Sequence, residues 1–332
     1  MSRKGHIFHF VMIVFALVIL LAAAPVAALE IVYPTDGTFV GKSNFLIVKG
    51  GQPALEGISV EINGVKSDLI DISSPQYRAT FKDFLILEPD FDPGINRIGV
   101  EGFAGGKAVA RQKAEVFFQA NPEDPVPARF RPFIMHLPEK EALCAGCHNM
   151  NPTTAQMNDP NLKANPCFSC HARLIDKAHV HGPAGVGECG ACHARDGKPS
   201  RYQPRPGDAL VCKECHADKV ADFRAKKFVH GPIDANMCLV CHSPHASDQP
   251  AQLERKVNEL CLSCHQAIKG SVHVLKGVDG KSHPLEGPTN PANRQKAFGC
   301  VGCHDPHGGM IESYFQNGIQ SRFALCALCH KK

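Results

Sequence analysis

Cysteine is absent from the first 143 of the 332 residues, and all 16 cysteines lie between Cys144 and Cys329. The N-terminal part of the chain therefore has no disulfide, no thiolate metal site and no cysteine for lipid attachment. This part also lacks the clusters of His, Asp and Glu that are typical of catalytic sites. Any cysteine chemistry must belong to the C-terminal part of the chain.

Charged side chains are absent from residues 5–29. This stretch follows Arg3 and Lys4, is mostly apolar, and ends in the small-residue run AAAPVAA at Ala28. The order is typical of a secretory signal peptide, residues 1–28, although the uncharged stretch is also long enough for an uncleaved membrane anchor. We favour cleavage and expect an exported, periplasmic protein, with a membrane-anchored or outer-surface location as the alternative.

All 16 cysteines belong to eight C-x-x-C-H pentapeptides, which we number motif one to motif eight in chain order. Consecutive motifs form four pairs, repeats one to four. The paired cysteines are Cys144 and Cys147, Cys167 and Cys170, Cys189 and Cys192, Cys212 and Cys215, Cys238 and Cys241, Cys261 and Cys264, Cys300 and Cys303, and Cys326 and Cys329. The histidines that end the motifs are His148, His171, His193, His216, His242, His265, His304 and His330.

The spacing of these motifs is that of c-type haem attachment. Two thiols three positions apart reach the two vinyl groups of one porphyrin as thioethers, and the adjacent His faces the iron as its proximal ligand. Zinc ribbons and disulfide frameworks also use paired cysteines. Neither needs a His after every second cysteine, so the sequence predicts eight covalently attached haem c groups.

Eight histidines remain outside the motifs, apart from two near the N-terminus, so there is one for each iron. They are His136, His179, His181, His230, His245, His273, His283 and His307. Any one of them can be an ordinary surface or core histidine, but as a set they predict distal ligands and bis-His haems. Six-coordinate haems favour one-electron transfer over binding of small molecules, and without a Met ligand they have low potentials.

The formal net charge is +4 and falls to +2 when the signal peptide leaves with Arg3 and Lys4. Each ferric haem with two ionised propionates adds about −1, so the mature oxidised protein carries a net charge of about −6. We therefore expect no nucleic-acid binding.

Residues 29–120 alternate short apolar runs with turn signals, and we expect six or seven strands in an antiparallel β-sandwich. The segment YRATFKDFLIL is interpreted as one of the strands, and Asn63-Gly64 and Gly105-Gly106 are expected hairpin turns. Through PTDGTFV and PGINRIGVEG this part resembles bacterial immunoglobulin-like modules. Such a module could dock a partner, act as a spacer or cap the haem domain.

Residues 121–132 contain four prolines and are expected to form an extended linker. Residues 133–332 are expected to be an octahaem domain of four dihaem repeats, made of short α-helices and loops with little regular sheet. About 25 residues per haem leave little room for a conventional core, so the haems replace it and the apo-domain is largely unstructured.

The repeats place histidines at recurring positions. His136, His181 and His230 each lie eight residues before the first cysteine of a repeat, whereas His283 lies 17 before Cys300 because of an insertion.

Two further pairs of histidines follow the motifs. His245 and His307 lie three residues past a motif His, where repeats one and two have Asn151 and Asp196. His179 and His273 lie eight residues past a motif His and are candidates for the remaining irons.

The pattern resembles the doubled C-x-x-C-H multihaem cytochromes c, most clearly in HGPIDANMCLVCHSPHASDQPAQLERKVNELCLSCH, residues 230–265. The resemblance covers about 200 of the 332 residues. It implies an electron carrier rather than an enzyme, which passes electrons along bis-His haems in respiratory or extracellular electron transfer. The implied partners are other multihaem cytochromes or a membrane quinol oxidoreductase.

Two alternatives stay open. The first is an octahaem oxidoreductase that reduces nitrogen or sulfur oxyanions at one open haem; an unligated His179 or His283 would favour it. The second is a subunit of a membrane quinol-oxidising complex, an outer-membrane conduit or a filament, in which the β module docks and one His ligates a neighbour's haem.

Overall fold

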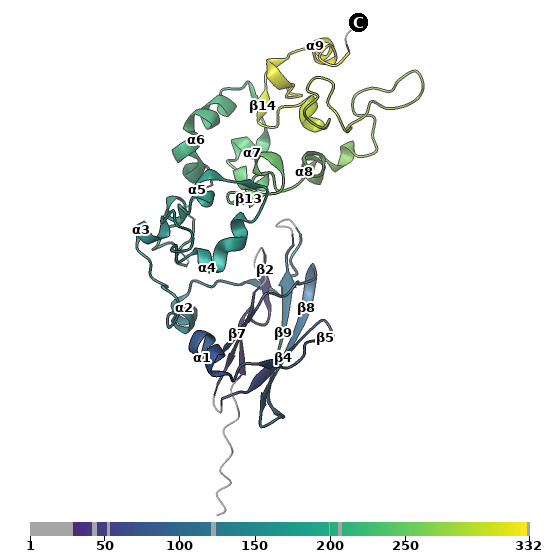
Figure 1. The fold of residues 1–332 in the computed structure, drawn as a ribbon. Coiled ribbons are helices and arrows are strands. Elements are labelled where there is room, and N and C mark those ends of the chain that lie inside the picture. Colours follow the sequence, from purple (N-terminus) through teal and green to yellow (C-terminus); the bar gives the residue numbers. More distant parts are fainter. Residues whose placement is uncertain are drawn as a thin grey trace, which may run out of the picture. The chain divides into compact units, whose positions relative to one another are not determined.

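The computed structural model describes residues 29–41, 45–51, 54–120, 124–198, 200–204 and 208–330 (Figure 1). The predicted signal peptide, residues 1–28, lies outside the described residues. The chain forms two compact units, residues 1–133 and residues 134–332. Within the described ranges, no helix is both long and apolar enough to cross a membrane.

The first unit is built almost entirely of strands. They are β1 (Leu29–Tyr33), β2 (Thr38–Val40), β3 (Leu46–Gly50), β4 (Gly57–Ile62), β5 (Val65–Lys66), β6 (Ile70–Asp71), β7 (Phe84–Leu87), β8 (Gly94–Ala104), β9 (Lys107–Phe118) and β10 (Arg131–Pro132), with one helix, α1 (Pro75–Phe81).

The strands form two sheets. One is three-stranded with the order β1-β3-β7, and the other has the order β10-β2-β9-β8-β4-β5, with β6 paired to β4. β2 runs parallel to β9, and β10 runs parallel to β2, so the expectation of purely antiparallel pairing was wrong at this edge. The partners are far apart in the sequence, so no hairpin dictates their direction, unlike that of β8 and β9.

Both predicted hairpin turns are confirmed. Asn63 and Gly64 connect β4 to β5, and Gly105 and Gly106 connect β8 to β9. All four residues have positive φ, between 52° and 86°, as a type I′ turn requires.

The strand prediction over YRATFKDFLIL was wrong in its first half, which forms helix α1. Ser74 accepts a hydrogen bond from the backbone N–H of Tyr77 at 3.2 Å, and Pro75 occupies the first helical turn. A serine N-cap followed by proline is a helix start signal that outweighs the local β propensity. The strand β7 begins only at Phe84.

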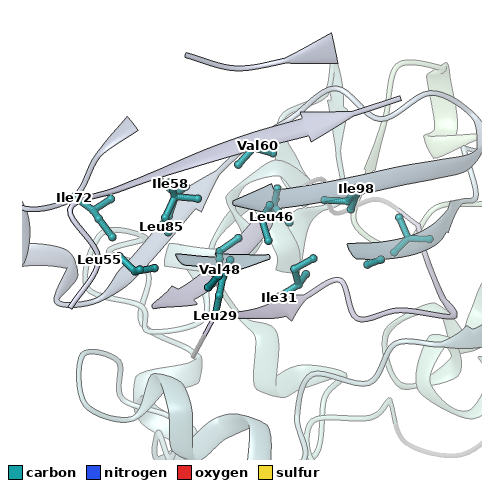
Figure 2. Close-up of a cluster of buried hydrophobic side chains, with 14 of the residues drawn as sticks. Leu29, Ile31, Leu46, Val48, Leu55, Ile58, Val60, Ile72, Leu85 and Ile98 are labelled. Atoms are coloured by element: carbon teal, nitrogen blue, oxygen red, sulfur yellow. The ribbon is translucent and has the colours of Figure 1, made fainter. Parts of the chain in front are cut away.

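One hydrophobic core joins the two sheets (Figure 2). Leu46 and Val48 of β3 and Ile58 of β4 are fully buried, and buried and less buried residues alternate along β3. Alternation of this kind places one face of a strand in the core. Residues 29–118 therefore fold around their own core, with side chains contributed by both sheets.

We expect Leu46→Ala to destabilise this unit by about 2–5 kcal/mol, because it deletes buried methyl groups and leaves a cavity. Amide hydrogen exchange of β3 and β4, followed by mass spectrometry on the full chain, should become faster. Val65→Ala is the matched control, because Val65 is 77% exposed and its truncation changes stability by about 0.5 kcal/mol or less. Equal exchange in both variants would contradict the core assignment.

The end of the predicted linker belongs to the first unit rather than forming a free connection. Arg131 and Pro132 form β10 beside β2, and Phe130 packs on Phe117 with ring centroids 5.7 Å apart. Phe133 meets Tyr33 edge-on at 4.6 Å.

The second unit consists of short helical segments and loops. Its α-helices are α2 (Pro138–Cys144), α3 (Thr154–Met157), α4 (Phe168–His171), α5 (Gly182–Gly185), α6 (Asp208–Arg224), α7 (Gly231–Asp234), α8 (Val257–Cys264) and α9 (Arg322–Cys326). Its 3₁₀ turns are η1 (Ala172–Ile175), η2 (Cys189–Ala191), η3 (Cys238–Val240), η4 (Pro250–Gln252), η5 (Gln266–Ile268), η6 (Cys300–Gly302) and η7 (Gln316–Gly318).

Among the described residues of the second unit, sheet is limited to two small ribbons. β11 (His179–Val180) pairs with β13 (Ala246–Ser247), and β12 (Phe228–Val229) pairs with β14 (Gly308–Gly309), both antiparallel.

The second unit has almost no hydrophobic core of its own. Among its described residues the buried hydrophobic side chains are Met157, Ala246 and Phe315. Large apolar side chains such as Leu210 and Phe323 remain 65% and 90% exposed. A chain of this length normally buries far more apolar surface, so this unit is shaped to pack around something other than its own side chains.

Candidate functional site

The eight motifs share one local backbone geometry. In seven of them the N–H of the motif His donates to the carbonyl of the first cysteine at 2.9–3.1 Å, as His148 does to Cys144. The remaining motif lies within helix α6. One helical turn places positions i, i+3 and i+4 on the same face, so both thiols and the imidazole of each motif point to the same side.

The alternatives to haem find no support in the side-chain geometry. No disulfide joins any of the 16 cysteines, all of which lie within the described residues. Throughout the described part of the chain, no group of three or more His, Cys, Asp or Glu side chains converges as a zinc site would require.

Seven motif histidines face a histidine from outside the motifs. The pairs and the distances between their ring centroids are His136 and His171 (6.2 Å), His181 and His216 (6.1 Å), His193 and His245 (6.0 Å), His230 and His265 (6.0 Å), His242 and His307 (6.3 Å), His273 and His304 (5.8 Å), and His283 and His330 (6.2 Å). Every pair combines one motif His with one non-motif His.

These distances match two imidazoles bound to opposite sides of one metal ion. A metal–imidazole bond is about 2.0–2.1 Å long and the ring centre lies about 1 Å behind the bonded nitrogen, so the two centres are about 6 Å apart. Direct ring packing does not require this separation, because aromatic centroids range over about 4.5–7 Å. The residues present therefore fit c-type haem: two thiols on one turn, a proximal imidazole, and a second imidazole at axial distance.

In three motifs a hydrogen bond selects the nitrogen that the imidazole offers to a metal. The Nδ1 atoms of His193, His242 and His304 lie 2.7, 2.9 and 2.6 Å from a backbone carbonyl oxygen nine residues later in the chain. Because a carbonyl only accepts, Nδ1 carries the proton and Nε2 keeps its lone pair.

Three non-motif histidines make the same kind of hydrogen bond. The Nδ1 atoms of His181 and His230 donate to the carbonyls of Pro244 and Pro306 at 3.0 and 2.9 Å. His283 donates to the carbonyl of Pro284 at 2.8 Å. Their Nε2 atoms are thereby also left for a metal.

The two ribbons join neighbouring repeats and carry these histidines. His181 directly follows β11 and His245 directly precedes β13, and the N–H of His181 donates to the carbonyl of His245 at 2.8 Å. In the second ribbon His230 follows β12 and His307 precedes β14. One ribbon therefore orients two imidazoles toward two different motifs.

The pairing follows a simple rule within each repeat. The His that precedes the first motif faces the His of the second motif, as His136 faces His171 and His181 faces His216. His283 obeys the rule by facing His330, even though an insertion displaces it in the sequence.

A second rule links consecutive repeats. His245 of repeat three faces His193 of repeat two, and His307 of repeat four faces His242 of repeat three. His304, in the last repeat, is faced instead by His273 from the segment between repeats three and four.

Burial keeps several of these imidazoles neutral, as metal binding requires. It lowers the pKa of His171, with smaller contributions from the neighbouring His136 and His193. It also lowers the pKa of His307 and of His273.

Neighbouring motifs also meet through their thiols. A hydrogen bond from Cys167 of motif two lowers the pKa of Cys189 of motif three to about 7. The same arrangement of Cys261 and Cys300, from motifs six and seven, lowers the pKa of Cys300 to about 7. Groups attached to these cysteines would be immediate neighbours across the boundary between two repeats.

The spacing of cysteines and histidines did not predict the polar network beside His136. Glu141 is buried, lies 3.0 Å from Nδ1 of His136, and accepts a hydrogen bond from Arg201 at 2.8 Å. Tyr202 packs edge-on against the His136 ring at 4.8 Å. At His136 the Glu141 carboxylate takes the place of the proline carbonyl that accepts from Nδ1 of His181 and of His230. Only the position of Glu141 in the fold shows this role.

Two of the sixteen predicted histidine ligands do not face a second imidazole ring. Within the described part of the chain, neither His148 of motif one nor His179 of β11 faces another histidine, and the two do not face each other.

Three segments of the chain, residues 181–221, 230–270 and 290–332, match the family model described as the doubled CXXCH motif. They correspond to repeats two, three and four, and the first two begin at His181 and His230. The matches support a multihaem c-type cytochrome with covalently bound haem. A comparison with curated proteins finds no match.

Several solved structures resemble part of the chain. An endo-beta-1,4-mannanase from Thermotoga petrophila is 13% identical over 29% of this chain and 20% of its own, with a TM-score of 0.23. A Bacteroides uniformis beta-glucuronidase 2 mutant is 12% identical over 28% of this chain and 11% of its own, with a TM-score of 0.20. Fibronectin(III)-like modules of Clostridium thermocellum CbhA are 10% identical over 28% of this chain and 98% of theirs, with a TM-score of 0.22. The chain spans only 20% and 11% of the two enzymes' lengths, and TM-scores this low support no inference about this chain.

Proposed function

We propose that the chain is an exported octahaem c-type cytochrome that carries electrons between redox partner proteins. The observation that supports this most directly is the set of seven motif histidines that each face a second imidazole at 5.8–6.3 Å. Filling both axial positions of an iron favours reversible electron transfer over the binding of small molecules.

The side chains have separate roles in this proposal. The two cysteines of each motif would hold one haem by two thioethers, and in seven motifs the paired histidines would ligate its iron. Carbonyls such as those of Tyr202 and Pro244 keep Nδ1 protonated and the rings in place. When bound, haem supplies one reversible Fe(III)/Fe(II) couple at each motif.

Contacts between repeats provide the continuity that electron transfer needs. Cys167 and Cys189 are neighbours across the boundary of repeats one and two, and Cys261 and Cys300 across the boundary of repeats three and four, so the haems they hold would be neighbours too. The His245–His193 pair joins repeat three to repeat two. All four repeats are thereby linked into one series.

Partners and location follow from the same chemistry. We propose other multihaem cytochromes or a membrane quinol oxidoreductase as donor and acceptor, in the periplasm or at a membrane surface. Residues 29–120, which we propose to be an immunoglobulin-like module, have their own core and no cysteine, so they suit docking rather than redox chemistry.

The test combines haem quantitation, low-temperature EPR and spectroelectrochemistry on the purified full chain. We expect eight haems, at least seven of them low-spin, and complete, reversible reduction and oxidation without added substrate. A double variant, Cys189→Ala with Cys192→Ala, should lose one haem and one low-spin signal. Fewer than seven low-spin haems in the parent chain would overturn the proposal.

A further inference from the structure

The loops that follow motifs three, five and seven have the same structure in three repeats. Each motif His forms a β-bridge with the residue eleven positions later: His193 with Pro204, His242 with Leu253, and His304 with Phe315. Each also donates from Nδ1 to the carbonyl nine positions later. The third residue after the motif His is therefore structurally equivalent in all three loops.

These equivalent positions hold Asp196, His245 and His307. His245 faces the first motif His of the preceding repeat, His193, and His307 does the same for His242. By the same relation, position 196 of repeat two should face His148 of repeat one. The residue there is an aspartate, so this position supplies no second imidazole to motif one.

Contacts confirm that the loop of repeat two lies against the segment that follows His148. Arg195 and Arg201 both donate to the side-chain oxygen of Asn151, at 3.1 and 2.8 Å. The hydroxyl of Tyr202 donates to the carbonyl of Met150 at 3.0 Å. Met150 and Asn151 are two and three residues past His148.

His179 does not occupy a position that serves motif one. It begins β11 opposite Ser247, in the ribbon between repeats two and three, as Phe228 begins β12 opposite Gly309 in the next ribbon. Phenylalanine is no metal ligand, so this register position has no ligand role in the neighbouring repeat. Next to His179 the strand is held by Asp248, which accepts from Lys177 at 3.0 Å and from the N–H of Ala178 at 3.3 Å.

We propose that the haem on motif one has no second histidine, so that its second axial position is open to a small exogenous ligand. The proposal rests on haem attachment at motif one, as proposed above. The chain thus combines seven closed positions for electron transfer with one open position for ligand binding.

The test uses the purified ferric full chain, with cyanide and nitrite as separate probes followed by EPR and optical titration. We expect one high-spin haem among eight, which either probe converts to low spin. Asp196→His should close the position, because it restores the residue found at 245 and 307, and should abolish both the high-spin signal and the probe response. Asp196→Asn is the matched control and should keep both.

Two results would overturn the open position. Eight low-spin haems that ignore both probes would exclude it and leave the electron-transfer function intact. A high-spin signal that arises only in His179→Ala would show that His179, from the same chain or from a second copy, is the missing ligand. Mass spectrometry of the peptide that contains Cys144 separates these outcomes from failure of haem attachment, which would overturn both proposals at motif one.

Discussion

Produced without haem attachment, residues 134–332 are expected to lose nearly all protection against amide hydrogen exchange, whereas residues 29–133 keep theirs. The reason is the distribution of buried apolar side chains: the first unit has a continuous core around Leu46 and Ile58, and the described part of the second has little beyond Met157 and Phe315. When bound haem groups supply the core, folding is coupled to their attachment. Hydrogen-exchange mass spectrometry on the full chain, with and without haem maturation, measures this directly.

A variant that lacks a single haem attachment controls for general destabilisation of the second unit. Cys326→Ala with Cys329→Ala removes one attachment at the C-terminal end, so protection should fall around α9 and persist in α6. Slow exchange of α6 and α8 in the haem-free chain would show that the second unit folds through its own side chains, contrary to the interpretation.

Replacing His245 is expected to change the haem on motif three specifically. His245→Ala should convert one low-spin haem to high spin, because it removes the imidazole that faces His193 at 6.0 Å. His245→Met should keep the haem low-spin and raise its midpoint potential by on the order of 100 mV, since a thioether ligand favours the ferrous state and axial ligands shift potentials over about 0.8 V.

EPR and a spectroelectrochemical titration measure both effects. His179→Ala serves as the matched control, because the structure places no ring opposite His179, and its spectrum should equal that of the parent chain. A parent-like spectrum for His245→Ala would show that another residue ligates motif three and that the pairing rule between repeats is wrong.

The motif turns and the two hairpins were interpreted correctly, because a few neighbouring residues decide their structure. The C-x-x-C-H spacing predicts thiols and imidazole on one side of a turn, and the backbone hydrogen bonds from His148 to Cys144 and from His171 to Cys167 have this geometry. Asn63-Gly64 is a turn because only residues that tolerate positive φ fit there. The strand assigned to residues 77–87 was wrong in its first half because the Ser74 cap and Pro75 start a helix.

Histidine counting alone suggested a second ligand for every iron, and here the sequence could not decide. The partners His193 and His245 are 52 positions apart, and His242 and His307 are 65 apart, so spacing does not reveal the pairing. The equivalence of Asp196 with His245 is visible only once the loops are superimposed through their bridges. A displaced ligand such as His283 is likewise recognised by its position opposite His330.

The sequence by itself determined the chemistry of this protein, because two cysteines and a histidine on one turn form a complete local attachment unit. It also determined that the first 143 residues hold no haem attachment motif, since no cysteine exists there. Only the tertiary structure decided which imidazole faces which motif, because the ribbons β11–β13 and β12–β14 bring together segments from different repeats. It likewise decided that motif one, unlike the other seven, has no second histidine facing it among the described residues. A distal ligand is recognised by its distance from the motif histidine, and the sequence does not contain that distance.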